Sequence, residues 1–247
     1  MPCLVAHRGQ KFNLPENTLE SVKQAIDCGA LAVEFDVQMT ADQVPVICHD
    51  PDLLRTAGVD ITIADVEYAD LKNISVGEPD RFAEKYQSVT LPALQTMVAM
   101  LQKVPQVKVF VELKSESIHA FGINSFLKPV VSQIQAIRQH CVVIADELEI
   151  LLALKRQSSI ATGWILHRWH DDDFTLAKQC NVDYLVMNHK YYRAEPEHDF
   201  AVDSWDWVMY ESNDAEQALA LFDKGVSFVE TADICSMLKQ LAHKRKT

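Results

Sequence analysis

The stretch Leu31-Ala-Val-Glu-Phe-Asp-Val37 is a short apolar run that carries two carboxylates. Its β-branched and aromatic residues are typical of a buried strand. Because successive side chains on a strand point to opposite faces, Glu34 and Asp36 lie on one face and Phe35 lies on the other. The two carboxylates are therefore expected to share one small volume.

A helix and another strand precede this stretch. Residues Thr18–Cys28 carry apolar side chains at helical spacing. Asn17, followed three residues later by Glu20, resembles a capping box, so we expect Asn17 to cap this helix. Gly29 fits a helix stop, since glycine accepts the left-handed backbone that ends many helices. With a predicted strand at Leu4–His7, the chain begins with a strand–helix–strand unit.

Strand-like and helix-like segments continue to alternate along the chain, which favours a parallel sheet with crossover helices. The predicted strands are Leu4–His7, Leu31–Val37, Val107–Leu113, Cys141–Ile144, Ile160–Leu166, Tyr184–Met187, Trp207–Tyr210 and Val226–Val229. Further helices are expected at Glu147–Arg156, Ala215–Lys224 and Ala232–His243. Eight strands in a chain of 247 residues predict an α/β fold of the (β/α)8 TIM barrel type.

The connection from Asp50 to Pro105 is much longer than the other links between strands. It contains two helix-like pieces, Ile63–Leu71 and Ala93–Leu101. We interpret this segment, approximately residues 50–105, as a small insertion after the second strand. The expectation is a single barrel domain over residues 1–247.

Composition argues against a membrane-spanning protein. The chain has 48% hydrophobic residues, a mean hydropathy of -0.06 and no apolar run of the ~20 residues that a bilayer requires. Met1 runs directly into an apolar strand and leaves no room for a leader, so we expect a cytoplasmic protein. The six cysteines are scattered, without the spacing of a zinc site or a disulfide scaffold, and most are expected to be buried thiols.

The net charge of -12 bears on the partners of the protein. It disfavours nucleic acid and anionic membrane surfaces, because both are polyanions. We therefore expect no nucleic-acid partner and no stable membrane insertion. A small anionic substrate fits if a local cation receives it. The sequence leaves the oligomeric state open.

Polar side chains gather at the ends of the predicted strands, where a barrel of this type has its active site. These groups are His7-Arg8-Gly9, Glu34 with Asp36, His49-Asp50, and Glu112 with Lys114. Glu34, Asp36 and Glu112 form a set of hard oxygen donors suited to Mg²⁺, Ca²⁺ or Mn²⁺. Without a cation, one of two such close carboxylates should hold a proton. Alternatively, the carboxylates form a structural ion network with Arg8 or Lys114.

His7 and His49 are the candidates for acid–base chemistry, because histidine can both donate and accept a proton near neutral pH. One would deprotonate the nucleophile, and the other would protonate the leaving oxygen. A lone histidine after a strand is more often structural, but here each lies near carboxylates and cations. Arg8 and Lys114 would hold a phosphate, or else only neutralise the carboxylates.

Five motifs occur in order between residues 7 and 114. They are His7-Arg8-Gly9, Pro15-Glu16-Asn17-Thr18, Glu34-Phe35-Asp36-Val37, Pro45-Val46 with His49-Asp50, and Glu112-Leu113-Lys114. Each is weak alone, but together they resemble the motif series of the glycerophosphodiester phosphodiesterase family. Weaker matches continue to Gly225-Val226, so the resemblance covers nearly the whole chain.

The resemblance implies a barrel enzyme that hydrolyses a small glycerophosphodiester to glycerol 3-phosphate and an alcohol such as choline or ethanolamine. It implies one divalent cation, Mg²⁺ or Ca²⁺ with Mn²⁺ as a further option, held by Glu34, Asp36 and Glu112. It assigns His7 and His49 as acid and base. Whether water or a hydroxyl of the substrate attacks first stays open, as do the preferred head group and the physiological metal.

Two departures from the family pattern lie near the C-terminus. The family commonly has Trp-Thr-Val-Asn where this chain has Tyr210-Glu211-Ser212-Asn213, so a phenol and a carboxylate replace an aromatic wall. Tyr210 is therefore the candidate for contact with the alcohol portion of the substrate. The family's Thr-Asp-x-Pro is here Glu230-Thr231-Ala232-Asp233, which we expect to alter a loop rather than the chemistry.

Three other polar or aromatic clusters have weaker interpretations. His167, His170 and the acidic run Asp171–Asp173 could form a second metal site, but acidic residues at a helix start more often favour its dipole. Residues 188–192 are expected to line the pocket mouth. Trp205 and Trp207 are expected in the core.

Two other functions compete with hydrolysis of small diesters. The same fold and metal could act on an intact lyso- or sphingophospholipid, although no amphipathic membrane-docking segment is visible. A non-catalytic barrel could bind phosphodiesters, but such a protein would be expected to lack one of the histidines or carboxylates. The substrate assignment depends on the resemblance alone.

Overall fold

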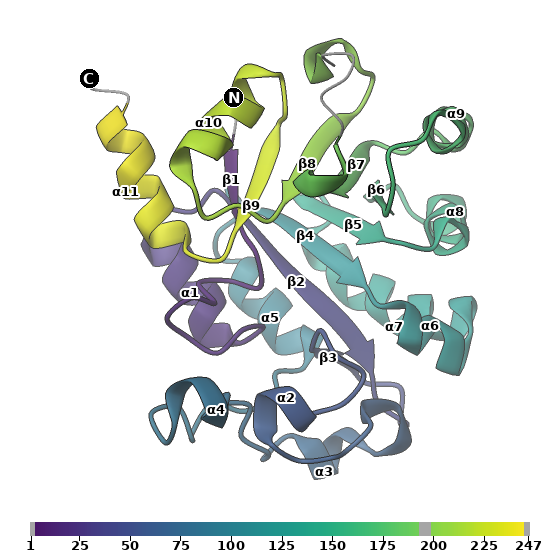
Figure 1. Cartoon of the computed structure of the whole chain (residues 1–247). Helices are drawn as coiled ribbons and strands as arrows, with labels where there is room; N and C mark the ends of the chain where they lie inside the picture. The colour runs from purple at the N-terminus through teal and green to yellow at the C-terminus, as the bar shows by residue number, and fades with distance from the viewer. Residues whose placement is uncertain (1–2, 193–198, 245–247) are drawn as a thin grey trace.

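The computed structural model describes residues 3–192 and 199–244. Eight parallel strands form a closed barrel with helices around it (Figure 1). The barrel strands are β1 (Cys3–Ala6), β2 (Ala32–Met39), β4 (Lys108–Leu113), β5 (Cys141–Ala145), β6 (Ala161–Leu166), β7 (Tyr184–Asn188), β8 (Asp206–Tyr210) and β9 (Phe228–Thr231). The barrel closes at β1, where Ala6 pairs with Val33 of β2 and with Thr231 of β9. The predicted (β/α)8 barrel is confirmed.

Seven of the predicted strands agree with the observed ones to within two residues at either end, with the first displaced by one residue, and the last is displaced by two residues. It was expected at Val226–Val229 and lies at Phe228–Thr231. Val226 is still part of the turn that ends the preceding helix, because its amide donates to the Leu221 carbonyl at 3.1 Å. Gly225 before it has a φ of +92°, a left-handed conformation that suits glycine. The strand therefore begins later than its β-rich sequence suggested.

Helices connect most of the strands. The longer ones are α1 (Leu19–Asp27), α5 (Leu94–Leu101), α6 (Ser115–Phe121), α7 (Ile123–Ile134), α8 (Leu148–Gln157), α9 (Asp171–Cys180), α10 (Ala215–Asp223) and α11 (Ile234–Lys244). The described part of the β7–β8 connection forms only the 3-10 turns η3 (His189–Tyr191) and η4 (Phe200–Val202). No helix in the described ranges is both long and apolar enough to cross a membrane.

The start of α1 differs from the sequence prediction by one residue. Thr18, not Asn17, is the cap: its hydroxyl accepts from the Ser21 amide at 3.1 Å, and the Ser21 hydroxyl accepts from the Thr18 amide at 3.2 Å. Asn17 has a φ of +57° and its side chain instead binds Asp36. The predicted stop is confirmed, since Gly29 follows α1 with a φ of +96°.

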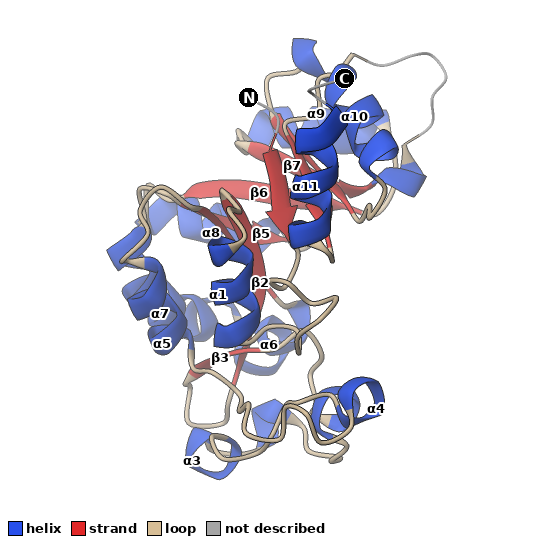
Figure 2. Ribbon diagram, turned by 90° about the vertical axis from the view of Figure 1, so that its left-hand side faces the viewer, coloured by secondary structure: helices blue, strands red, loops and turns tan. Residues whose placement is uncertain are grey.

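The segment after β2 begins with a short antiparallel strand, β3 (Pro45–Ile47). Its short helices are α2 (Leu54–Ala57), η1 (Ile63–Asp65), α3 (Tyr68–Leu71) and α4 (Pro79–Phe82). The single helix expected at Ile63–Leu71 is thus two pieces, whereas the helix expected at Ala93–Leu101 is α5. In Figures 1 and 2 the pieces α3 and α4 lie at the end of the molecule away from α10. We propose that approximately residues 50–105 form an insertion within one barrel domain.

Apolar side chains pack against both the outer and the inner face of the barrel wall. The larger layer fills the space between the strands and the outer helices. A second cluster fills the barrel interior and includes Phe110, whose ring meets Tyr184 and Phe228 edge-on. The segment after β3 has a separate small cluster around Leu53 and Leu71. The packed interior supports the polar groups at the strand ends from below.

A disulfide joins Cys28, directly after α1, to Cys235 in α11. The expectation that most cysteines are buried thiols is wrong: of the other four only Cys48 and Cys141 are buried, while Cys3 and Cys180 are partly exposed. The bonded pair is separated by 207 residues in the sequence, so no local spacing could reveal it. The bond ties together the first and last long helices of the barrel.

Candidate active site

An open cavity of about 200 Å³ lies at the carboxyl ends of the barrel strands. Six side chains proposed from the sequence line it, namely His7, Arg8, His49, Glu112, Lys114 and Tyr210. Glu34 and Asp36 lie beneath this lining, with exposed fractions of 1% and 0%. The strand ends thus bring together side chains that are far apart in the sequence.

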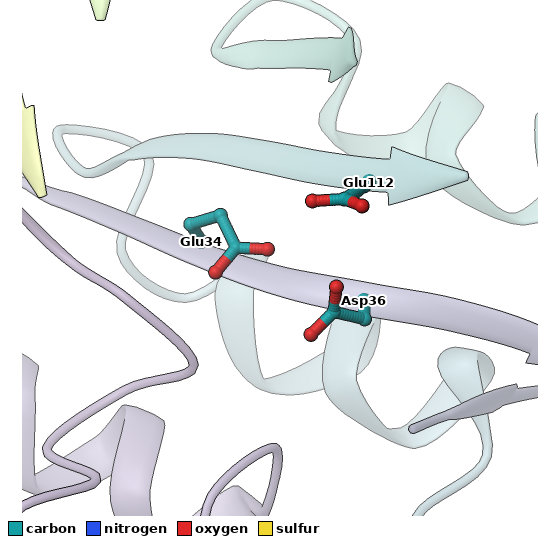
Figure 3. A group of neighbouring side chains, drawn as sticks. All are labelled: Glu34, Asp36 and Glu112. Atoms are coloured by element: carbon teal, nitrogen blue, oxygen red, sulfur yellow. The ribbon is translucent and has the colours of Figure 1, made fainter. Parts of the chain in front are cut away.

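The three carboxylates proposed as metal ligands form one group (Figure 3). Glu34 and Asp36 come from β2, and Glu112 comes from β4, where it pairs in register with Asp36. One oxygen from each of the three lies within 4.8 Å of the others. Figure 3 shows that the side chains from the two strands face the same space.

Burial and mutual repulsion change the pKa values of these carboxyl groups. Burial, together with the neighbouring Asp36, raises the pKa of Glu34 well above its ordinary value. Burial also raises the pKa of Glu112 to about 7. Burial acts on Asp36 in the same sense, but Arg8 and Lys114 outweigh it and hold the pKa of Asp36 well below its usual range. The unequal pKa values agree with the expectation that close carboxylates cannot all ionise without a cation.

Both interpretations of the carboxylates have structural support. Arg8 Nε lies 3.1 Å from Asp36 Oδ2, and Lys114 Nζ lies 2.6 Å from Glu112 Oε1, as an ion network requires. However, Glu34 Oε1 and Asp36 Oδ1 are buried and accept no hydrogen bond from the described residues, and Lys114 Nζ lies 3.7 Å from Asp36 Oδ1. Buried oxygens are rarely left without a partner. Three hard donors with two such oxygens fit a divalent cation, while Asp36 Oδ2 and Glu112 Oε1 pair with Arg8 and Lys114.

Neighbouring side chains fix the orientation of Asp36 and Arg8. Asn17 Nδ2 donates to Asp36 Oδ2 at 2.8 Å, and the Asp36 amide donates to Asn17 Oδ1 at 3.2 Å. Arg8 Nη1 donates to Glu16 Oε1 at 2.9 Å. A Cβ at Gly9 would lie 2.5 Å from the Ser21 backbone, so only glycine fits this close approach of the loop to α1. The loop after β1 is therefore positioned by α1.

His7 lies between two sets of carboxylates. Its Nε2 is 3.9 Å from Glu34 Oε2 and 3.9 Å from Glu230 Oε2. Its Nδ1 forms a hydrogen bond with Glu211, which also pairs with Lys11 at 2.5 Å. Burial lowers the pKa of His7 to about 4, although the bond to Glu211 acts in the opposite sense. The ring is therefore neutral near pH 7.

His49 is more exposed and has its own carboxylate. Its Nδ1 lies 2.6 Å from Asp50 Oδ1, and the other Asp50 oxygen accepts from Arg55 Nε at 2.6 Å. Arg55 also donates to Glu16 Oε1 at 2.7 Å. Burial raises the pKa of Asp50, but Arg55 and His49 outweigh it and lower that pKa. Asp50 is thus charged and holds one ring nitrogen of His49.

Glu230 is a site residue that the sequence prediction missed. We expected it to alter a loop, but it lies within β9, is 3% exposed and lines the cavity. Burial, with the nearby Glu112, raises its pKa to about 8. The signal was present in the sequence, because a strand placed two residues later would have put this carboxylate at its carboxyl end.

The other wall of the cavity contains Tyr210, Asp146 and His167. His167 Nε2 lies 3.9 Å from Asp146 Oδ2. Burial raises the pKa of Tyr210, so its phenol stays protonated. This wall combines a hydroxyl, an imidazole and a carboxylate with apolar residues.

The other clusters have structural roles where they are described. His170 caps α9, and Asp171–Asp173 form its first turn; within the described ranges, three potential metal ligands converge only at Glu34, Asp36 and Glu112. Residues 188–192 do not line the cavity described above. Trp205 and Trp207 are buried as expected, although both also line a separate aromatic pocket.

Comparisons with known proteins agree with this arrangement. A family model described as the glycerophosphoryl diester phosphodiesterase family matches residues 7–196. Glycerophosphodiester phosphodiesterase 1 of Bos taurus is 26% identical over 164 residues, 66% of this chain and 48% of the relative. A glycerophosphodiester phosphodiesterase of Bacillus altitudinis is 31% identical over 135 residues, 55% of this chain and 54% of the relative. The chain thus spans about half the length of these curated relatives.

Solved structures show the same fold. An Oleispira antarctica phosphodiesterase in complex with the product sn-glycerol-3-phosphate superposes with a TM-score of 0.85 at 23% identity, covering 98% of this chain and 97% of that one. A glycerophosphodiester phosphodiesterase from Thermotoga maritima gives a TM-score of 0.79 at 18% identity, covering 97% and 98%. At such identities the likeness concerns the fold alone.

Proposed function

This chain belongs to the glycerophosphoryl diester phosphodiesterase family, and from this membership we propose that it hydrolyses small glycerophosphodiesters to glycerol 3-phosphate and an alcohol. The observation that carries the proposal is the cavity at which buried carboxylates, His7, His49 and two cationic side chains converge. The Oleispira protein, which was solved with sn-glycerol-3-phosphate as its product, supports the choice of substrate class.

The proposed metal ligands are Glu34, Asp36 and Glu112. Their oxygens suit Mg²⁺ or Ca²⁺, with Mn²⁺ as a further option. The bound ion would stabilise the negative charge that develops on the phosphoryl oxygens. Asn17 keeps Asp36 oriented toward the shared space, and Arg8 and Lys114 balance the remaining carboxylate charge.

His7 and His49 are the proposed base and acid. His7 is neutral near pH 7, so its ring can accept the proton of the attacking hydroxyl. His49, held by Asp50, would give a proton to the oxygen of the leaving alcohol. The positions of both rings on the cavity wall support these roles.

Arg8 and Lys114 are proposed to bind the phosphate, since both line the cavity beside the carboxylates. Tyr210 is proposed to contact the alcohol portion from the other wall. Such a substrate requires neither nucleic acid nor insertion into a membrane. We further propose a cytoplasmic location. The disulfide between Cys28 and Cys235 makes this location testable, because structural disulfides are rare in the cytosol. If the protein is cytosolic, an alkylating reagent added at lysis should modify both cysteines as free thiols.

Release of glycerol 3-phosphate from glycerophosphocholine tests the proposal. Metal-stripped protein should be inactive and should recover when Mg²⁺, Ca²⁺ or Mn²⁺ is added, with a chelator as control. A lysophospholipid is assayed in parallel to separate the lipid substrate class. Folded protein that releases no glycerol 3-phosphate with any of these metals would overturn the proposal.

A further inference from the structure

The two histidines proposed as base and acid, His7 and His49, each contact a carboxylate, and each of these carboxylates contacts a cation. On one side the chain of contacts is His49, Asp50 and Arg55, all within seven residues of sequence. On the other side it is His7, Glu211 and Lys11, in which His7 and Glu211 are 204 residues apart. The second arrangement exists only because β8 brings its following residue beside the loop after β1.

The contacts of Glu211 converge on one oxygen. Glu211 Oε2 bonds to His7 Nδ1 and lies 2.5 Å from Lys11 Nζ. Lys11 Nζ is also 3.0 Å from His7 Nδ1, but Nδ1 lies closer to Glu211 than to Lys11 and cannot bond to both, so Glu211 is taken as its partner. An ammonium carries only donors, and the carboxylate is the acceptor that both neighbours need. Glu211 therefore has a fixed place rather than a free surface position.

The two ring nitrogens of His7 face different surroundings. The Nδ1 atom points to Glu211, whereas Nε2 lies 3.9 Å from both Glu34 and Glu230. A neutral imidazole has one proton, and a carboxylate acceptor holds it on the nitrogen that the carboxylate faces. The lone pair is then on Nε2, on the side of the proposed phosphoryl site.

We propose that Glu211 is a positioning residue that holds the Nδ1–H tautomer of His7 and turns Nε2 toward the cavity, with Lys11 holding Glu211 in place. The proposal depends on the proposed function, because it assigns His7 a partner in that reaction. It makes Glu211 act through His7 rather than on the substrate. Removing it should change turnover more than substrate affinity.

Kinetics of two Glu211 variants provide the first test. Glu211→Ala should lower kcat by about 10²-fold and leave KM within about threefold, because a histidine in the wrong tautomer cannot accept the proton. Glu211→Gln should recover part of the loss, since its amide oxygen can still accept from Nδ1. Glu216→Gln removes an exposed carboxylate paired with Lys244 and should leave kcat unchanged. A rise in KM with unchanged kcat in Glu211→Ala would instead place Glu211 in substrate binding.

Histidine ¹⁵N NMR of the metal-free protein provides a test that needs no activity. The His7 signals, assigned by their loss in His7→Asn, should show the proton on Nδ1 in the wild type and on Nε2 in Glu211→Ala. The same tautomer in both proteins would overturn the proposal. If the wild type releases no glycerol 3-phosphate, the proposed function fails, whereas the tautomer comparison still decides the role of Glu211.

Discussion

At the scale of single residues, the buried carboxyl groups determine how the metal-free protein responds to pH. The pKa of Glu112 rises from an ordinary value of 4.5 to about 7, and that of Glu230 rises to about 8. Between pH 4.5 and 8 the folded protein thus holds protons that the unfolded chain has released. These two groups therefore lower the free energy of unfolding as the pH rises through this window, and His7, whose pKa is lowered to about 4, acts in the opposite sense only below pH 6.5.

A chelated sample should therefore have a Tm that decreases from pH 5 to pH 8. Added Mg²⁺ or Ca²⁺ should raise Tm more at pH 8 than at pH 5, because the cation competes with protons for the same oxygens. Thermal unfolding at both pH values, with and without the metal, measures this effect. The variant Glu112→Gln should show a smaller dependence on pH. A metal-induced shift that is equal at both pH values would contradict the assignment of the ligands.

Substitution of the two histidines tests their proposed chemistry. His7→Asn and His49→Asn should each lower kcat by about 10²–10⁴-fold, as expected for loss of a general acid or base. Neither ring is a proposed metal ligand, so the metal-induced rise in Tm should stay nearly unchanged. Rates of glycerol 3-phosphate release and thermal shifts measure the two effects separately. Full activity in one variant would remove that histidine from the mechanism.

At the scale of elements, two neighbouring residues at the start of α1 have different roles. Thr18 caps the helix, whereas Asn17 orients Asp36 in the site. Thr18→Ala removes the cap and should cost about 1 kcal/mol of stability without changing metal affinity. Asn17→Ala should cost about 2–4 kcal/mol, because it removes two bonds to buried Asp36 and places alanine at a φ of +57°. Only this variant should bind the metal more weakly. Denaturant unfolding and metal titration of both variants check the contrast.

The same elements show what the sequence could and could not predict. The pairing of Glu34 and Asp36 in the site was predictable, because side chains alternate between the two faces of β2 and these two therefore share one face. The cap was displaced because Asn17 and Thr18 are both good capping residues, and only contact with Asp36 decides between them. Glu230 was missed because the turn after α10 extends to Val226 and delays β9. A tertiary contact thus determined the position of the cap, whereas the local turn at Gly225 and Val226 determined the start of β9.

At the scale of the whole molecule, the disulfide joins the first and last long helices of the barrel, α1 and α11. A bond that closes a loop of 207 residues can contribute up to about 5 kcal/mol, chiefly by restricting the unfolded chain. Reduction, or the double substitution Cys28→Ser and Cys235→Ser, should lower Tm by roughly 10 °C. Scans with and without reductant measure this, and the double variant should not respond to reductant. Equal Tm values under both conditions in the wild type would contradict a stabilising bond.

The meeting of the first and last strands has a consequence for biosynthesis. All five motifs lie between residues 7 and 114 and leave the ribosome early, but Glu211 and Glu230 are translated much later. The barrel closes only when β9 pairs with β1. A nascent chain, or a fragment cut before β8, would therefore carry every recognisable motif and still lack a finished pocket. A fragment that ends before β8 is therefore expected to release no glycerol 3-phosphate, although it contains all three proposed metal ligands.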